Sequence, residues 1–204
     1  MAECMKERVE TNPVLSAEER DLLSEAYKNA VGSRRSAWRT LTPVEQSEAA
    51  TWLRERVETE IKELCGDVLT LVDKLLGSET LEYEAQVFYY KMKGDYYRYL
   101  VEVSDGEDRA NKAKKAKKAY EQAWAAAKPL RATNPVKLEL ALNVSVFHYE
   151  ILNQVDSACT MAKEAFDAAL ADESPDCNYG DSQAIMIQLR GNLTLWQSET
   201  NAED

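Results

Sequence analysis

Residues 91–100 read Lys91-Met92-Lys93-Gly94-Asp95-Tyr96-Tyr97-Arg98-Tyr99-Leu100. The stretch is expected to lie inside a helix, and it places cations and tyrosines around one aspartate in a protein whose net charge is −11. At about 100° per residue, Lys91, Asp95 and Arg98 fall on one face of that helix. A carboxylate between two long cations can hold an arginine fork in position and leave its other donors for a second anion. We expect that second anion to be a phosphate carried by a partner protein.

The composition limits the class of protein and its partners. The 204 residues are 45% hydrophobic and 30% charged, as in an ordinary soluble globular protein. With only 7 glycines and 5 prolines, the chain favours helix. Its acidic balance disfavours nucleic acid or an anionic membrane as a partner. We find no apolar run of membrane-spanning length and no signal peptide, so we expect a cytoplasmic protein.

The residues that most often carry catalysis or bind metals are isolated in this sequence. Cys4, Cys65, Cys159 and Cys177 lack metal-ligand spacing and are interpreted as reduced thiols. His148 is the single histidine, and it has no Ser or Cys partner at motif spacing. We therefore expect no metal, no cofactor and no catalytic residue.

Hydrophobic periodicity and capping signals predict an all-α fold. Ser16 and Glu19 have the spacing of a capping box, Thr42 followed by Pro43 predicts a second helix start, and Gly32 in mid-helix indicates close packing. No stretch alternates with period 2 for long enough to predict a sheet. We expect one antiparallel bundle in residues 1–198 and a short acidic tail in residues 199–204. The predicted helices cover residues 1–10, 16–41, 42–76, 80–103, 107–128, 135–152, 156–171 and 181–198.

Several stretches dispersed along the chain carry a recognisable pattern. They are Ala26-Tyr27-Lys28-Asn29, Gly32-Ser33-Arg34-Arg35-Ser36-Ala37-Trp38-Arg39, residues 91–100, Leu140-Ala141-Leu142-Asn143-Val144-Ser145-Val146-Phe147 and Asn192-Leu193-Thr194-Leu195-Trp196. Together these stretches resemble one protein family, the 14-3-3 phosphopeptide-binding adaptors. The resemblance covers almost the whole chain. It implies a bundle of the 14-3-3 type, a signalling adaptor without catalysis, and a groove for phosphoserine or phosphothreonine segments, often of the RSxpSxP type.

The resemblance also implies which residues bind the partner. The phosphate would be held by Lys28, Arg35, Arg98 and the hydroxyl of Tyr99. The residues implied to contact the peptide have four roles: Asn143 and Asn192 on its backbone, Leu142, Val146 and Leu195 as an apolar wall, Glu150 and Trp196 at one end, and Lys91 near the residues that follow the phosphate. Helical spacing supports the sets, because Leu142, Val146 and Glu150 share one helix face.

The chain departs from the family pattern at its N-terminus and within the groove, among other positions. Met1 falls partway into the family's second helix, so the first helix and the start of the second are missing, and with them one side of the dimer seam. A homodimer is therefore expected to be weakened or absent, unless the sequence is truncated. Within the groove, Glu139 replaces a usual glycine and Gln188 a usual leucine. A carboxylate at position 139 would repel acidic peptides and change the preferred motif.

Two other functions remain open at this point. The chain can be a helical scaffold that binds partners through the apolar wall without depending on phosphate. An α-helical enzyme is disfavoured, because no Gly-rich phosphate loop, nucleophile–base pair or metal cluster is found. The basic run in residues 111–118 is interleaved with alanine and is interpreted as a solvated helix face.

Overall fold

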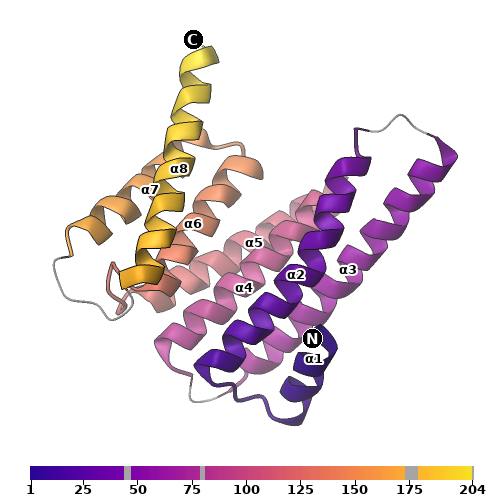
Figure 1. Ribbon diagram of the computed structural model, residues 1–204, viewed down its shortest axis with the longest axis horizontal. Helices are drawn as coiled ribbons and strands as arrows, with labels where there is room; N and C mark the ends of the chain where they lie inside the picture. The colour runs from indigo at the N-terminus through magenta and orange to yellow at the C-terminus, as the bar shows by residue number, and fades with distance from the viewer. Residues whose placement is uncertain (44–46, 79–80, 173–178, 204) are drawn as a thin grey trace. The chain divides into compact units, whose positions relative to one another are not determined.

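The computed structural model describes residues 1–43, 47–78, 81–172 and 179–203, and within them the chain forms eight helices and no strand (Figure 1). The predicted all-α fold is confirmed. None of the described helices combines the length and apolar character needed to cross a membrane. The helices are α1 (Ala2–Thr11), α2 (Ala17–Leu41), α3 (Glu48–Leu76), α4 (Tyr83–Glu102), α5 (Gly106–Ala127), α6 (Pro135–Glu150), α7 (Val155–Leu170) and α8 (Tyr179–Glu203).

The chain divides into two compact units. Unit 1 consists of Met1–Leu81 and Met92–Ala116, and unit 2 of Glu82–Lys91 and Lys117–Asp204. Helices α4 and α5 therefore each contribute residues to both units. The single domain expected over residues 1–198 stays a prediction.

In unit 1, helices α1, α2 and α3 pack against one another. The predicted capping box at the start of α2 is present: the Glu19 amide donates to Ser16 Oγ at 3.2 Å, and the Ser16 amide donates to Glu19 Oε2 at 2.9 Å. The same Glu19 carboxylate accepts from Arg8 Nε at 2.7 Å and Nη2 at 3.0 Å. The arginine thereby ties the end of α1 to the first turn of α2.

The start of α3 differs from the prediction. Thr42 is the C-cap of α2, with its hydroxyl donating to the Trp38 carbonyl at 2.8 Å, and it does not begin the next helix. The N-cap of α3 is Ser47, whose Oγ accepts from the Ala50 amide at 3.1 Å. The Thr-Pro pair was wrong as a start signal because threonine can equally donate back to a carbonyl one turn earlier.

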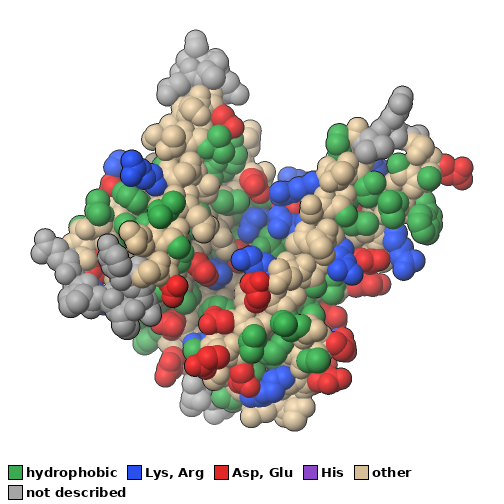
Figure 2. Space-filling view, viewed as in Figure 1, with side chains coloured by type: hydrophobic (Ala, Val, Ile, Leu, Met, Phe, Trp, Pro, Cys, Tyr) green, Lys and Arg blue, Asp and Glu red, His purple; other side chains and the backbone are tan. Residues whose placement is uncertain are grey.

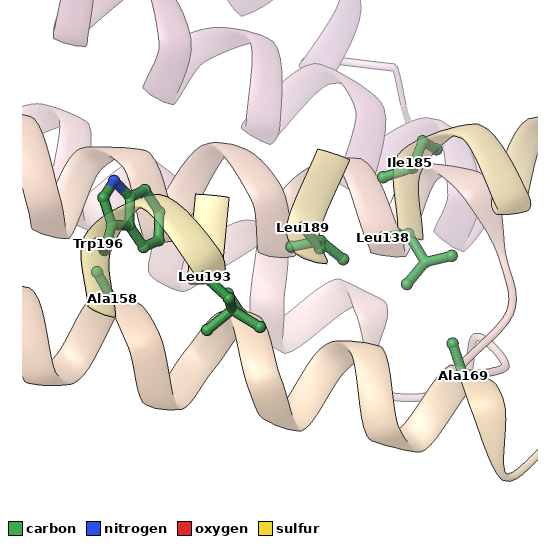
Figure 3. Packing of buried hydrophobic residues seen from close by; sticks show 8 residues of the cluster. Leu138, Ala158, Ala169, Ile185, Leu189, Leu193 and Trp196 are labelled. Atoms are coloured by element: carbon green, nitrogen blue, oxygen red, sulfur yellow. The ribbon is translucent and has the colours of Figure 1, made fainter. Parts of the chain in front are cut away.

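In unit 2, helices α6, α7 and α8 surround a common hydrophobic core. Figure 3 shows Ile185, Leu189, Leu193 and Trp196 of α8 directed towards the other two helices. Their spacing of three or four residues is that of one helix face. Helix α8 continues to Glu203, beyond the end expected near Ser198.

Figure 2 shows hydrophobic side chains on the surface of α3 near its N-terminal end. Trp52 is 62% exposed and Leu53 is 43% exposed, whereas the apolar positions of α3 from Ile61 onwards are largely buried. Helix α3 therefore contributes a core face only from Ile61 onwards.

Candidate functional site

An arginine of α2 and a glutamate of α4 form the tightest ion pair of the candidate site. Arg35 donates from Nε to Glu102 Oε2 at 2.9 Å and from Nη2 to Glu102 Oε1 at 2.6 Å. Their side chains are only 18% and 10% exposed. This bidentate geometry fixes the guanidinium plane, and the Nη1 donors take no part in the pair.

The ring of Tyr99 contacts both arginines of the candidate site. The Arg35 Cζ atom lies 3.9 Å from the ring centroid and the Arg98 Cζ atom 4.8 Å from it. Two guanidinium groups from different helices thus contact one tyrosine. Stacking on an aromatic ring is a common way to orient a guanidinium while its hydrogen-bond donors remain directed outwards.

Arg98 is oriented by a carboxylate on its own helix. Its Nη2 atom lies 3.4 Å from Asp95 Oδ1, and the two side chains are 7% and 8% exposed. The i, i+3 pair expected from the sequence between Asp95 and Arg98 is therefore present. Because both partners are almost enclosed, the arginine has little freedom to turn away.

Below the site, unit 1 presents apolar or uncharged groups. Tyr96 packs edge-on against Tyr99, with ring centroids 5.3 Å apart, and burial raises the pKa of Tyr96 so that its phenol stays neutral. Burial also raises the pKa of the Cys65 thiol to about 12. A dry support of this kind strengthens electrostatic interactions at the site above it.

The fourth predicted phosphate ligand, Lys28, lies on the same face of α2 as Arg35 but seven residues earlier. That spacing is about 10 Å along the helix axis. Lys28 is exposed, so its long side chain can move to reach a ligand.

A hollow of about 330 Å³ adjoins Arg35 on α2, lined by Gly32, Arg35, Ser36, Arg39 and Thr40. A Cβ atom built on Gly32 would meet nothing within 4 Å. The close packing expected at Gly32 is therefore wrong, because the glycine borders the open hollow. Arg39 also pairs with Glu102, at 3.4 Å.

The local charge suits an anion in a protein that is acidic overall. Among the described residues, Lys28, Arg35, Arg39 and Arg98 are four cations, and the carboxylates that pair with the three arginines are Asp95 and Glu102. The three arginines carry planar forks, which match the oxygens of a phosphate. We name the group Lys28, Arg35, Arg98 and Tyr99 the cationic site.

In unit 2, the residues predicted to contact peptide on α6 form one strip of that helix. Leu142, Asn143 and Val146 are half-buried and Glu150 is exposed. Leu142 and Val146 also pack against the core shared with α7 and α8. The strip therefore has a rigid support beneath it.

The predicted peptide-contacting residues on α8 differ among themselves in exposure. Leu195 is 53% exposed and Asn192 is half-buried, whereas Trp196 is only 3% exposed. Trp196 stacks on Tyr149 of α6, with ring centroids 4.8 Å apart and planes at 18°, and Tyr149 donates to Glu199. The indole thus belongs mainly to the core, and any contact with a peptide would use its edge.

Lys91, the last predicted contact residue, is held by an acid of α6. Its Nζ atom lies 3.0 Å from Glu139 Oε2 and 5.7 Å from the centroid of the Phe88 ring. The sequence placed Lys91 and Glu139 in the same groove but gave no sign that they pair, because they are 48 positions apart in the chain.

The sequence analysis did not single out Glu102 and Arg39, two residues that adjoin the cationic site. A signal was present for each: Glu102 lies four residues after Arg98, and Arg39 four residues after Arg35, so each pair shares a helix face. The pairing of Arg35 with Glu102 joins two helices and could not be read from spacing within either one.

A larger cavity of about 740 Å³ lies in unit 2 and is lined by none of the predicted site residues. Its wall carries two carboxylates, Asp156 and Glu164, against one lysine, Lys137, so the cavity is a poorer fit for a phosphate than the arginine-rich region of α2 and α4. Within the described ranges, no three His, Cys, Asp or Glu side chains are close enough together to hold a metal ion.

Comparison with known proteins identifies the class. Residues 1–197 match a family model described as 14-3-3 protein. The chain is 50% identical over 214 residues to 14-3-3 protein zeta of Bombyx mori, covering 100% of this chain and 87% of the relative. It is 48% identical over 215 residues both to 14-3-3 protein beta/alpha-B of Xenopus laevis and to 14-3-3-like protein 2 of Caenorhabditis elegans, covering 100% of this chain and 88% and 87% of these relatives.

These matches define an all-helical adaptor that binds partner proteins and is not an enzyme. The chain belongs to the 14-3-3 family.

Proposed function

We propose that the chain binds phosphoserine- or phosphothreonine-containing segments of partner proteins and acts as a signalling adaptor in the cytoplasm. Lys28, Arg35, Arg98 and the Tyr99 hydroxyl are the phosphate ligands in this proposal. The peptide ligands are Lys91, Leu142, Asn143, Val146, Glu150, Asn192, Leu195 and Trp196.

The observation that carries the proposal is the contact of Arg35 and Arg98 with one tyrosine ring. Each guanidinium is also held by a carboxylate, Arg35 by Glu102 and Arg98 by Asp95. Long cationic side chains usually lose conformational entropy when they bind a ligand. In this protein the contacts with Tyr99, Glu102 and Asp95 already fix the two arginines before a ligand binds. A preorganised pair of forks therefore favours a compact dianion over a mobile surface counterion.

The chemistry of the ligand also limits the choice. Phosphoserine carries about −1.5 to −2 charges at pH 7 and three acceptor oxygens, whereas a glutamate carries one charge and two oxygens. Net hydrogen bonds to charged groups contribute roughly 1.5–3 kcal/mol each. Several such bonds separate a phosphorylated segment from its unphosphorylated form by orders of magnitude in affinity.

Fluorescence anisotropy with one peptide of the RSxpSxP type, in its phosphorylated and unphosphorylated forms, tests the proposal. We expect saturable binding of the phosphorylated form and at least about 100-fold weaker binding of the other, the loss of two charge-assisted bonds at minimum. Equal affinity for the two forms would instead support a scaffold that binds through the apolar residues Leu142, Val146 and Leu195.

A further inference from the structure

The cavity of about 740 Å³ lies wholly within unit 2, and its walls come mainly from α5, α6 and α7. We call it the α5–α7 cavity. Small-molecule sites are clefts of roughly 300–1,000 Å³ that are lined mostly by apolar side chains with a few polar groups. The α5–α7 cavity has that size, and its described lining includes none of the proposed phosphate or peptide ligands.

The inner wall of the α5–α7 cavity is apolar. Leu138 and Ala141 of α6 are each only 1% exposed, and Leu138 belongs to the core that α6, α7 and α8 share. Trp124 of α5 and Met161 of α7 are half-buried. An aromatic ring and a thioether both make favourable contacts with a second aromatic ring. The wall therefore suits a ligand with a flat aromatic body.

The indole of Trp124 carries a hydrogen-bond donor that the protein leaves unused. Its Nε1 atom is buried and has no acceptor among the described residues. Buried donors are nearly always paired in folded proteins, so an unpaired donor in a cavity wall is a feature that a ligand can complete. Met161 lines the same cavity, and its flexible side chain can move to let a ligand oxygen approach the indole.

The charged groups of the wall favour a cation over an anion. Asp156 and Glu164 are exposed carboxylates of α7, and neither forms an ion pair within the described ranges. Lys137 also lines the cavity, but its Nζ donates to the Leu130 carbonyl at 2.8 Å. It lies 11 positions before His148 on α6, which is about 16 Å along the helix axis.

Asp156 lies at the end of the cavity that is remote from Lys137. Helices α6 and α7 pack against each other and are joined by only residues 151–154, so they run antiparallel. The end of α6 and the start of α7 therefore lie together, and their macrodipoles, of opposite sign there, offset each other. His148 lines this end, with Nδ1 3.0 Å from Gln154 Oε1. The described wall thus offers Asp156 no lysine or arginine as a counterion.

We propose that the α5–α7 cavity binds a small aromatic amine that carries a hydrogen-bond acceptor. The aromatic body lies against Trp124 and Met161, the acceptor oxygen takes the hydrogen of Trp124 Nε1, and the protonated amine pairs with Asp156. This site does not depend on the phosphopeptide proposal, because the two share no residue.

Three dansyl probes of different charge test the site at pH 8. Dansyl ethylenediamine is a cation, dansyl amide is neutral and dansyl glycine is an anion. In each probe the naphthalene ring is the aromatic body, and the sulfonyl group supplies acceptor oxygens. Dissociation constants are measured from the rise in dansyl fluorescence. We expect saturable binding that weakens from the cation to the neutral probe to the anion, in steps of about two- to fivefold, the scale of an exposed ion pair.

Four variants assign the binding to this cavity. Asp156→Asn should remove the preference for the cation over the neutral probe. Asp181→Asn is the matched control and should keep the preference, because Asp181 is an exposed aspartate of α8 in the same unit and does not line the cavity. Trp124→Phe keeps an aromatic ring but removes the donor, and it should weaken all three probes by about two- to tenfold. Thr160→Trp, at an exposed position of the wall, should fill the cavity and abolish saturable binding.

Circular dichroism checks that each variant is folded, and Ala168→Trp, at another exposed position of the wall, replaces Thr160→Trp if that variant is not. The inference is overturned if no probe binds saturably to the wild-type chain, or if filling the cavity leaves probe binding unchanged. It is also overturned if Asp156→Asn keeps the preference for the cation, or if Asp181→Asn removes it equally, since the preference would then come from the overall negative charge. Unchanged affinities in Trp124→Phe would contradict the part assigned to the indole donor.

Discussion

Replacing Arg35 by lysine separates the role of the guanidinium fork from that of its charge. Lys retains one positive charge, but it has a single nitrogen and cannot bind Glu102 through two nitrogens while directing a third towards a ligand. In the structure, Nε and Nη2 of Arg35 are occupied by Glu102 at 2.9 and 2.6 Å. Nη1 is therefore the group we assign to the phosphate.

The magnitude follows from that assignment. Losing one hydrogen bond to a charged group costs roughly 1.5–3 kcal/mol, which is about a 10- to 100-fold loss in affinity. The fold should survive, because lysine keeps the positive charge next to Glu102, and the lost stacking of Arg35 on Tyr99 is a contact of about 0.5–1 kcal/mol. Arg35→Lys should therefore bind phosphopeptide about 10- to 100-fold more weakly while its thermal unfolding changes little.

Anisotropy gives the affinity and circular dichroism gives the unfolding midpoint. The matched control is Arg34→Lys, one position earlier on α2, where Arg34 pairs with Glu60 at 3.2 Å and belongs to no part of the cationic site. That variant should bind within about twofold of wild type, the scale of an exposed ion pair. Wild-type affinity for Arg35→Lys, in a folded protein, would show that the guanidinium does not contact the phosphate.

Four further outcomes are expected. Lys28→Glu should abolish measurable phosphopeptide binding with an unchanged circular dichroism spectrum, because Lys28 is exposed; binding within threefold of wild type would exclude it as a ligand. Arg98→Ala should lose binding and also lower the free energy of unfolding by roughly 3 kcal/mol in urea titrations, because it removes one partner of a buried ion pair; an unchanged unfolding midpoint would contradict that burial. Phosphopeptide affinity should fall as the pH drops from 7 to 5, because the second phosphate pKa is about 6 and the monoanion binds less well; a flat profile would count against recognition of the dianion. In thiol labelling read by mass spectrometry at pH 8, exposed Cys4 should react before Cys65, which should react only after unfolding, because burial raises the pKa of Cys65 to about 12 and keeps it in the thiol form. Rapid labelling of Cys65 in the folded protein would contradict the packing under the cationic site.

Local sequence signals predicted those parts of the structure that depend on neighbours in the chain. The Ser16–Glu19 capping box and the Asp95–Arg98 pair each lie within one helical turn, and both are present. The Thr42–Pro43 start failed because the same local pattern suits the end of α2, where Thr42 donates to Trp38. The existence of each helix was therefore easier to predict than its boundary.

Contacts between helices were beyond the reach of such signals. Nothing in the spacing of α2 indicates that Arg35 pairs with Glu102, and nothing in α4 indicates that Lys91 pairs with Glu139. The surroundings of Gly32 were likewise not predictable from its place in the helix, because it borders open space and not a packed neighbour. The weakened homodimer stays a prediction, and it is checked by light scattering on the purified chain.

The most direct test of the central claim is a crystal structure of the chain with a phosphoserine peptide bound. The account predicts phosphate oxygens within about 2.6–3.0 Å of Arg35, Arg98 and Tyr99 Oη, with Glu102 still bound to Arg35. A phosphate that binds elsewhere, with these three side chains unchanged and without ligand contact, would contradict it.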